Sequence, residues 1–155
     1  MRFTTIVTFI FLFFSATLTF SQPLESFENL LEANKVGKVF IKKIGSDISQ
    51  TTFLGTIKDE KGNIKYYVVN KFLKVQAANL YHGNSSILFF NNEKKLVKEA
   101  NLSLPEELPF KLKSNFLYFR YSENGTRKIF KDKLEPFPKV ICVNPKSCYD
   151  ISIPS

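Results

Sequence analysis

Only a few side chains in this sequence have types and spacings that could support catalysis. His82 is the single histidine, and Ser85 lies close to it in the polar segment 81–86. A serine near a histidine could begin nucleophilic catalysis, but that chemistry also needs an orienting acid and an oxyanion site, and no Gly-x-Ser-x-Gly segment occurs. We therefore expect His82 to be a turn residue. A histidine that contacts a ligand is the second interpretation, and a hydrolase built on His82 and Ser85 is a remote alternative.

Two further groups of polar residues could hold a metal ion or transfer protons. Glu106 and Glu107 lie side by side between two prolines. Neighbouring carboxylates on one loop usually diverge, so we expect a solvated loop. The acids of the segment 59–63 are too few and wrongly spaced for a calcium loop. A closed zinc site needs about four ligands, whereas the sequence has two cysteines and one histidine. The sequence therefore predicts no metal site and no cofactor.

The two cysteines, Cys142 and Cys148, are separated by five residues. A redox pair would more usually have the spacing Cys-x-x-Cys, so we predict a structural disulfide in an oxidising compartment. Closing so small a loop contributes roughly 2 kcal/mol in the chain-entropy view. Such a bond would hold the C-terminal segment in place.

A basic and aromatic run extends from Lys111 to Lys133. The run contains seven basic residues and two acidic residues. Single-stranded nucleic-acid binders combine basic side chains and aromatic rings in this way. Two observations argue against nucleic acid: the run lacks the glycines of an RNP1 pattern, and the N-terminal segment described below predicts export. A solvated sheet edge, protected by lysines from further strand pairing, is the plainer interpretation. The binding residues that the run predicts are Arg120, Tyr121, Arg127 and Lys128, with His82 as a more distant candidate.

The element that must position these residues is a β-hairpin. Segment 116–121 is aromatic and extended in character, Asn124-Gly125 suits both centres of a type I′ turn, and segment 127–130 returns. Counting outward from the turn predicts three pairs on one face and one on the other. These are Glu123 with Thr126, Tyr121 with Lys128 and Phe119 with Phe130, and then Arg120 with Ile129. We expect the other strands to be stacked on either side of this hairpin.

The first 21 residues have the pattern of a signal peptide. A positive start at Met1-Arg2 precedes an apolar run, and small residues lead to a cut between Ser21 and Gln22. An uncleaved membrane anchor is the alternative, because the run approaches the ~18 residues that can span a bilayer. Cleavage would leave 134 residues with a net charge of +7 and no transmembrane segment. We therefore expect one β-rich domain, residues 22–155, that is exported to a periplasm or the cell exterior; the sequence predicts no oligomeric state.

The rest of the chain predicts one helix followed by strands. Segment 23–34 has leucines at helical spacing and ends before Gly37. Alternating segments follow, with predicted breaks at Asn70-Lys71 and at the turn 81–86, and the apolar run Ile87–Phe90 predicts a strand buried on both faces. The fold class is mainly β: an antiparallel meander of about 8–10 strands in a bent sheet, barrel or sandwich, with one short N-terminal α-helix.

These features predict an exported protein that binds and does not catalyse. In the first version, the hairpin contacts an acidic protein or an anionic polysaccharide, because a positive surface attracts anionic partners. In the alternative, a small β-barrel encloses an apolar ligand. The aromatic residues Phe89, Phe90, Phe116 and Phe119 would then line a cavity instead of filling a core.

Overall fold

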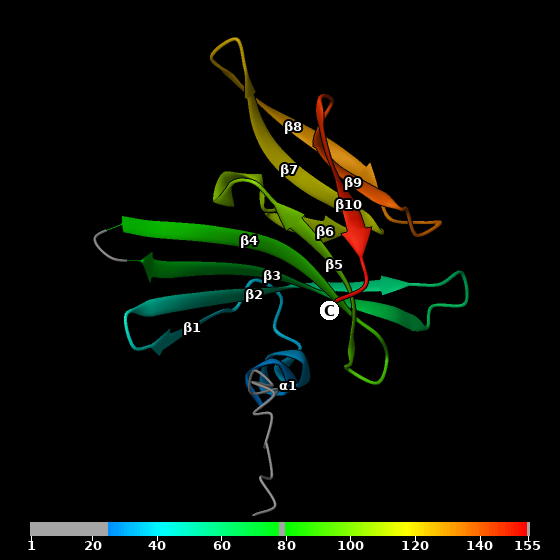
Figure 1. The fold of residues 1–155 in the computed structure, drawn as a ribbon. Coiled ribbons are helices and arrows are strands. Elements are labelled where there is room, and N and C mark those ends of the chain that lie inside the picture. Colours follow the sequence, from blue (N-terminus) through cyan, green and yellow to red (C-terminus); the bar gives the residue numbers. More distant parts are fainter. Residues whose placement is uncertain (1–24, 78–79, 155) are drawn as a thin grey trace, which may run out of the picture.

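The computed structural model describes residues 25–77 and 80–154 and shows a mainly β protein (Figure 1). The elements follow in this order: α1 (Glu25–Ala33), β1 (Val39–Ile44), β2 (Asp47–Lys58), β3 (Ile64–Ala77), β4 (Leu80–Phe90), β5 (Leu96–Leu102), the 3-10 helix η1 (Pro105–Glu107), β6 (Lys111–Lys113), β7 (Phe116–Glu123), β8 (Thr126–Lys133), β9 (Val140–Asn144) and β10 (Ser147–Ser152). The predicted signal peptide and its cleavage site lie outside the described residues. Within the described ranges, no helix is long and apolar enough to cross a membrane.

The strands form two antiparallel sheets. The larger sheet has the order β1-β2-β3-β4-β5-β10-β9, and the smaller has the order β6-β7-β8. The predicted fold class, antiparallel and mainly β with one short helix, is confirmed. The larger sheet ends at β1 and β9, and these edges are not paired with each other, so the described strands form no closed barrel.

The larger sheet is covered on both faces, which gives three layers. Helix α1 lies against one face and the smaller sheet against the other (Figure 1). Strand β4 shows why: Leu88 and Phe90 pack in the cluster beneath the helix, whereas Ile87 and Phe89 pack in the cluster beneath the smaller sheet. The predicted strand buried on both faces is confirmed, and burial of each such side chain is worth ~1.5–3 kcal/mol.

The predicted N-terminal helix is also confirmed within the described residues. Leu30 and Leu31 are buried against the sheet, and the ring of Phe27 lies 5.2 Å from that of Phe90. On the exposed side, the Glu32 carboxylate lies 3.3 Å from Lys94 Nζ. An apolar stripe facing a sheet and polar residues on the exposed side are typical of an amphipathic surface helix.

The predicted hairpin has the predicted register. Strands β7 and β8 pair Glu123 with Thr126 and Arg120 with Ile129, together with the other pairs counted from the turn. Asn124 and Gly125 have φ values of 51° and 75°, as a type I′ turn requires. The hairpin belongs to the smaller sheet, however. The expectation that the other strands lie on either side of it is wrong, because seven of them form the larger sheet on one face.

Two predicted breaks are wrong because the strands continue through them. Strand β3 passes Asn70, which is 8% exposed and whose Nδ2 donates to the Pro109 carbonyl at 2.6 Å. This long-range bond satisfies the NH₂ group of the Asn70 side chain inside the strand, whereas its Oδ1 is buried without a hydrogen-bond partner. The predicted turn 81–86 lies within β4, which pairs with β3 as far as its first residue, Leu80. A two-residue turn at Ser114 and Asn115, with φ values of 51° and 60°, was not predicted.

The predicted disulfide is present between β9 and β10. Cys142 and Cys148 are cross-strand partners and their sulfur atoms are 2.02 Å apart. The backbone N–H of Cys142 donates to Asp132 Oδ2 at 2.8 Å, which connects β9 to β8. The end of the larger sheet is thereby held beside the smaller sheet.

Candidate functional site

Strand register sorts the side chains of the smaller sheet onto two faces. Paired residues point to the same face, and successive residues alternate. Leu117 and Phe119 are fully buried against the larger sheet and mark the inner face. The opposite side, called the outer face below, carries these residues: Lys111, Lys113, Phe116, Tyr118, Arg120, Ser122, Arg127, Ile129, Lys131 and Lys133.

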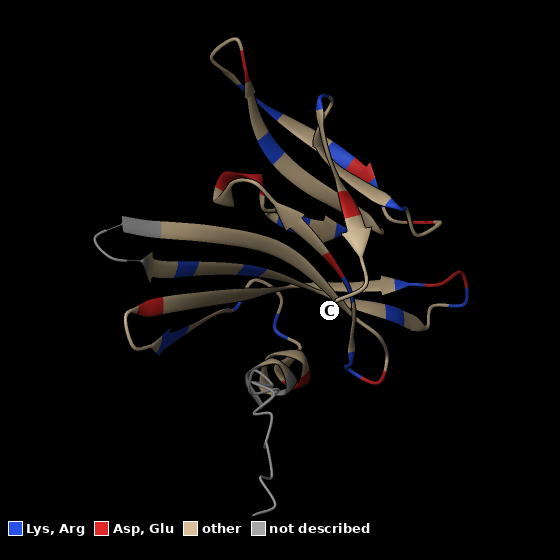
Figure 2. Cartoon of the chain, in the orientation of Figure 1, with Lys and Arg blue, Asp and Glu red and all other residues tan. Residues whose placement is uncertain are grey.

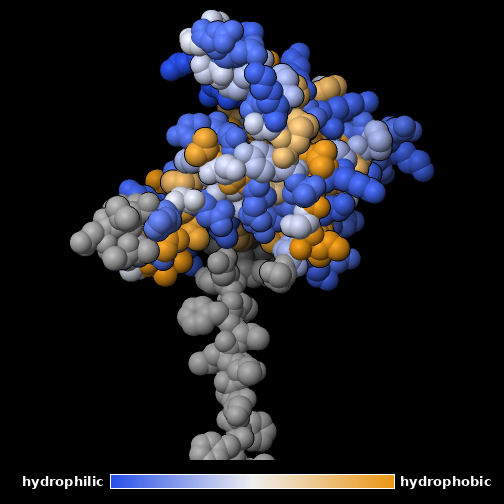
Figure 3. Space-filling model, turned by 45° about the horizontal axis from the view of Figure 1, so that its top comes forward, coloured by the Kyte–Doolittle hydropathy of each residue, from blue (hydrophilic) through white to orange (hydrophobic). Residues whose placement is uncertain are grey.

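The outer face carries six cationic side chains and no acidic one. Both acids of the segment, Glu123 and Asp132, fall on the inner face by the same alternation. All six cations are exposed, and the ion pairs between described residues involve none of them. Figure 2 shows basic positions on all three strands, and in Figure 3 hydrophilic residues cover most of the upper part of the molecule. The charge of this face is therefore available to a partner.

Aromatic rings hold several of these cations in position. The Tyr118 ring lies between two lysines, with Lys111 Nζ at 5.7 Å and Lys131 Nζ at 5.5 Å from its centroid. The guanidinium carbon of Arg120 lies 3.9 Å from the centroid of the Phe110 ring, which in turn contacts Tyr118 edge to face. A cation over a ring face gains ~0.5–1 kcal/mol at an exposed site. The result is a basic platform with an aromatic centre.

The four predicted binding residues of the hairpin are divided between its two faces. Arg120 and Arg127 lie on the outer face, whereas Tyr121 and Lys128 are paired on the inner face. Lys128 Nζ lies 2.6 Å from Glu123 Oε2, and the hydrogen bond and charge of Glu123 raise the pKa of Lys128. Lys128 is therefore already paired within the hairpin.

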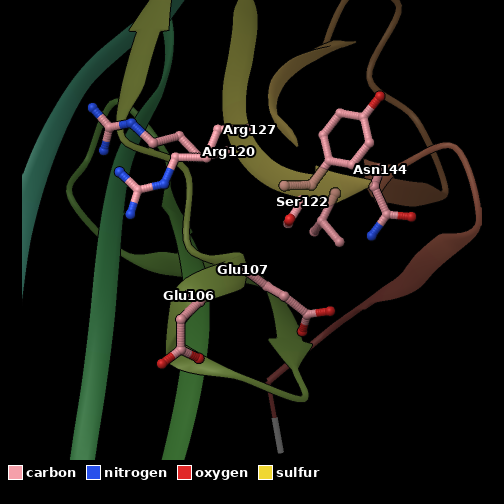
Figure 4. A pocket seen from close by; sticks show the side chains of 8 residues that line it. Glu106, Glu107, Arg120, Ser122, Arg127 and Asn144 are labelled. Atoms are coloured by element: carbon pink, nitrogen blue, oxygen red, sulfur yellow. The ribbon is translucent and has the colours of Figure 1, made fainter. Parts of the chain in front are cut away.

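A pocket of about 470 Å³ lies beside the hairpin (Figure 4). Four elements line it: Glu106 and Glu107 come from η1, Arg120, Tyr121 and Ser122 from β7, Arg127 from β8, and Val143 and Asn144 from β9. Figure 4 shows the two arginine side chains running side by side in the same direction. Three of the four hairpin residues predicted to bind thus meet in this pocket.

The acidic pair of η1 is only partly the solvated loop that the sequence predicts. Glu106 is exposed, but Glu107 Oε2 accepts hydrogen bonds from the backbone N–H groups of Ser103 and Leu104, at 3.1 and 3.0 Å. The same oxygen accepts a 2.7 Å bond from the Tyr149 hydroxyl. Glu107 therefore fixes η1 against β10, and Glu106 is the acid that remains available in the pocket.

His82 lies on the other side of the larger sheet from this arrangement. It is exposed in β4 and pairs with Val75 on the helix side of the larger sheet. Ser85 is buried and, three residues along the same strand, points to the opposite face. The strand therefore does not assemble the Ser85–His82 pair that the hydrolase alternative needs, and it separates His82 from the two arginines.

The geometry for the apolar-ligand alternative is also absent from the described part of the chain. Phe89 and Phe119 fill the core between the sheets, whereas Phe90 points to the helix. These rings interdigitate with other side chains on two faces and do not surround one cavity. No group of three or more His, Cys, Asp or Glu suited to a metal ion occurs among the described residues.

Comparison with known proteins adds no assignment. A scan against protein-family models finds no match, and searches of curated proteins and of solved structures find no similar chain or fold.

Sequence reasoning missed the contributions of Phe110, Glu106 and Asn144 to the site. The period-two count that gave the hairpin register could have sorted the bases by face, but no local signal brings Glu106 beside Asn144.

Proposed function

We propose that the protein is an exported, non-enzymatic binding protein whose outer face contacts an anionic partner. The observation that carries this proposal is the sorting of charge by strand register: six exposed cations lie on one face and both acids of the segment on the other.

The partner classes that fit are an acidic protein and an anionic polysaccharide. Both offer repeated negative groups along a chain, which several cations on one sheet can contact at once. The half-buried Tyr118 and Phe116 add flat apolar surface between the cations. Exposed charges interact weakly one at a time, at ~0.2–1 kcal/mol each, so affinity must come from several contacts together.

The test is a comparison of two fourfold variants with the same net charge. The outer-face variant combines Lys111→Gln, Arg120→Gln, Arg127→Gln and Lys131→Gln. The control combines Lys42→Gln, Lys61→Gln, Lys139→Gln and Lys146→Gln, whose side chains are exposed elsewhere. Binding to immobilised dextran sulfate, polygalacturonate and poly-L-glutamate is measured by surface plasmon resonance in low and in physiological salt.

We expect the outer-face variant to lose at least about fourfold in affinity and the control less than about twofold, since four contacts of ~0.2–1 kcal/mol each are removed only in the first. Wild-type binding should weaken as salt rises, because the Debye length falls to ~8 Å at physiological ionic strength. Equal losses in both variants, or binding that salt does not change, would overturn the proposal.

A further inference from the structure

The two arginines of the pocket are arranged to hold one anionic group together. Arg120 pairs with Ile129 and Ser122 pairs with Arg127, so the arginines are diagonal neighbours on the outer face. The Phe110 ring holds the Arg120 guanidinium at 3.9 Å, and a stacked guanidinium keeps the N–H groups in its plane available. Neither arginine is ion-paired to a described residue. A planar carboxylate matches the fork of a guanidinium.

The other walls of the pocket offer neutral hydrogen-bonding groups and two acids, of which Glu107 already accepts three hydrogen bonds through Oε2. Asn144 Oδ1 accepts from the backbone N–H groups of Lys146 and Ser147, at 2.8 and 3.0 Å, which leaves its NH₂ group as a donor. Glu106 forms no hydrogen bond or ion pair with another described residue and is an acceptor. Such groups suit hydroxyls, which both donate and accept.

Size and charge together favour a sugar acid over other anions. The volume of about 470 Å³ falls in the ~300–1,000 Å³ range of pockets for small organic ligands, more than one carboxylate fills. A ligand with several negative groups would be repelled by Glu106, whereas a hydroxyl would donate to it. Tyr121 also lines the pocket, from the inner side of β7.

We infer that this pocket binds one carboxylate-bearing sugar residue of an acidic polysaccharide. Arg120 and Arg127 bind the carboxylate, and Glu106 accepts from a hydroxyl. Arg120 and Arg127 belong to both the pocket and the outer face, so the neighbouring sugars of the same chain lie over Tyr118 and its two lysines. The inference rests on the proposed function and names the partner class of that site.

The first test keeps the net charge and removes only the arginine forks. Arg120→Lys with Arg127→Lys is compared with the control Lys111→Arg with Lys131→Arg. Calorimetric titrations use hexagalacturonate, maltohexaose, dextran sulfate and poly-L-glutamate. We expect the arginine variant to lose about tenfold in affinity for hexagalacturonate. The loss for dextran sulfate should be smaller, because its many sulfates can also contact the four lysines of the outer face. The control should retain both affinities, and neutral maltohexaose should bind neither protein.

The second test uses Glu106→Ala, for which the two probes should respond in opposite directions. The two probes are hexagalacturonate and dextran sulfate. Loss of the Glu106 carboxylate removes an acceptor for a sugar hydroxyl, so hexagalacturonate affinity should fall about threefold. The same change removes a negative charge that repels sulfates, so dextran sulfate affinity should rise. The sugar-acid site would be overturned if Glu106→Ala changed the affinity for hexagalacturonate and dextran sulfate equally. It would also be overturned if the arginine variant lost as much affinity for poly-L-glutamate as for hexagalacturonate. Either result would leave the anion-binding face intact. Absence of wild-type binding to every charged probe would instead remove the proposed function.

Discussion

Arg127 and Lys128 are adjacent in sequence but differ in what their charges can do. Arg127 is exposed on the outer face and is not ion-paired, whereas Lys128 points to the inner face and is paired with Glu123. The pKa of Lys128 is raised by that pairing, so its charge is held within the hairpin. A count of basic residues along the sequence treats the two alike.

This difference gives a prediction with a built-in control. Arg127→Gln and Lys128→Gln remove the same net charge from neighbouring positions. We expect Arg127→Gln to weaken binding to dextran sulfate about threefold, in line with ~0.2–1 kcal/mol for one exposed charge, and Lys128→Gln to change it less. Surface plasmon resonance at low salt measures both. A larger loss for Lys128→Gln would contradict the assignment of faces.

Asp132 predicts a dependence of stability on pH. Burial raises the pKa of its carboxyl group above the ordinary value of 3.8, and the N–H donors of Cys142 and Lys133 offset this only in part. The folded protein therefore keeps this proton to a higher pH than the unfolded chain. The stabilisation linked to that proton is present at low pH and is lost as pH rises from about 3.8 through the folded pKa.

Asp132→Asn should abolish this contribution, because an amide does not titrate and its oxygen still accepts from Cys142. The free energy of unfolding is measured by urea denaturation at pH values from 3.5 to 6.5. As pH rises over this range, the variant should lose less of this free energy than the wild type does. At pH 7 the variant should be at least as stable as the wild type. Asp132→Ala lacks the acceptor and should be less stable than Asp132→Asn by about 1 kcal/mol. If the unfolding free energy fell more steeply with rising pH in Asp132→Asn than in the wild type, the direction assigned to the Asp132 pKa shift would be wrong.

One turn residue, Asn115, forms hydrogen bonds between the smaller sheet and the end of β2 in the larger sheet. Asn115 Oδ1 accepts from the Lys58 N–H at 3.2 Å, and its Nδ2 donates to the Lys58 carbonyl at 2.8 Å. The Asn115 carbonyl also accepts from the Leu134 N–H at 2.9 Å. The side chain thus pairs with the end of β2 as a strand backbone would, and it positions β6 and β7.

Substitutions at Asn115 separate these bonds from backbone strain. Asn115→Gly tolerates a φ of 60° but loses the side-chain bonds, and we expect it to lose about 1–2 kcal/mol of unfolding free energy. Asn115→Ala loses the same bonds and adds left-handed strain, so it should lose about 1 kcal/mol more. Denaturant unfolding measures both. Two variants as stable as the wild type would contradict the role of this turn.

Helix α1 is predicted to depend on the sheet beneath it. Leu30 is fully buried in the cluster with Phe53 and Val69, so Leu30→Ala should lower the unfolding free energy by about 2–4 kcal/mol. Asn29→Ala, at an exposed position of the same helix, is the matched control and should change it by less than about 0.5 kcal/mol. Chemical denaturation compares them. Equal effects would mean that the helix does not pack as described.

Local signals explain which elements were predictable from the sequence. The β7–β8 register follows from Asn124-Gly125 and the alternation beside it, all within a few residues. The β6–β7 turn lacks glycine, so Asn115 is the only weak sequence signal for its two positive φ values. The start of β4 was predicted as a turn because His82, Gly83 and Asn84 are polar or small; they are exposed, so no apolar alternation marks the strand.

The candidate site was predictable only in part, because it depends on long-range packing. Arg120, Tyr121 and Arg127 were found through the basic and aromatic run, and they do line the pocket. Glu106 and Asn144 come from η1 and β9, which lie on either side of the hairpin in sequence and meet beside it only through the packing of the two sheets. Stacking of Arg120 on Phe110 likewise depends on the unpredicted pairing of β6.

At the scale of the whole molecule, the layers place different chemistry on opposite sides. Helix α1 covers one face of the larger sheet, and the smaller sheet covers the other with its cationic face turned outward (Figures 1 and 2). The chain has a formal net charge of +8, and the outer face concentrates six cations without an acid. Concentrated charge of one sign steers an oppositely charged partner to that side.

The most direct measurement of this central claim is an NMR titration of the isotopically labelled protein with short dextran sulfate chains. We predict that amide shifts concentrate in β6, β7 and β8 and shrink as salt is added, while amides of α1 and β1 stay unchanged. Shifts spread over exposed lysines throughout the protein, or concentrated at α1, would contradict the claim that the outer face is the binding surface.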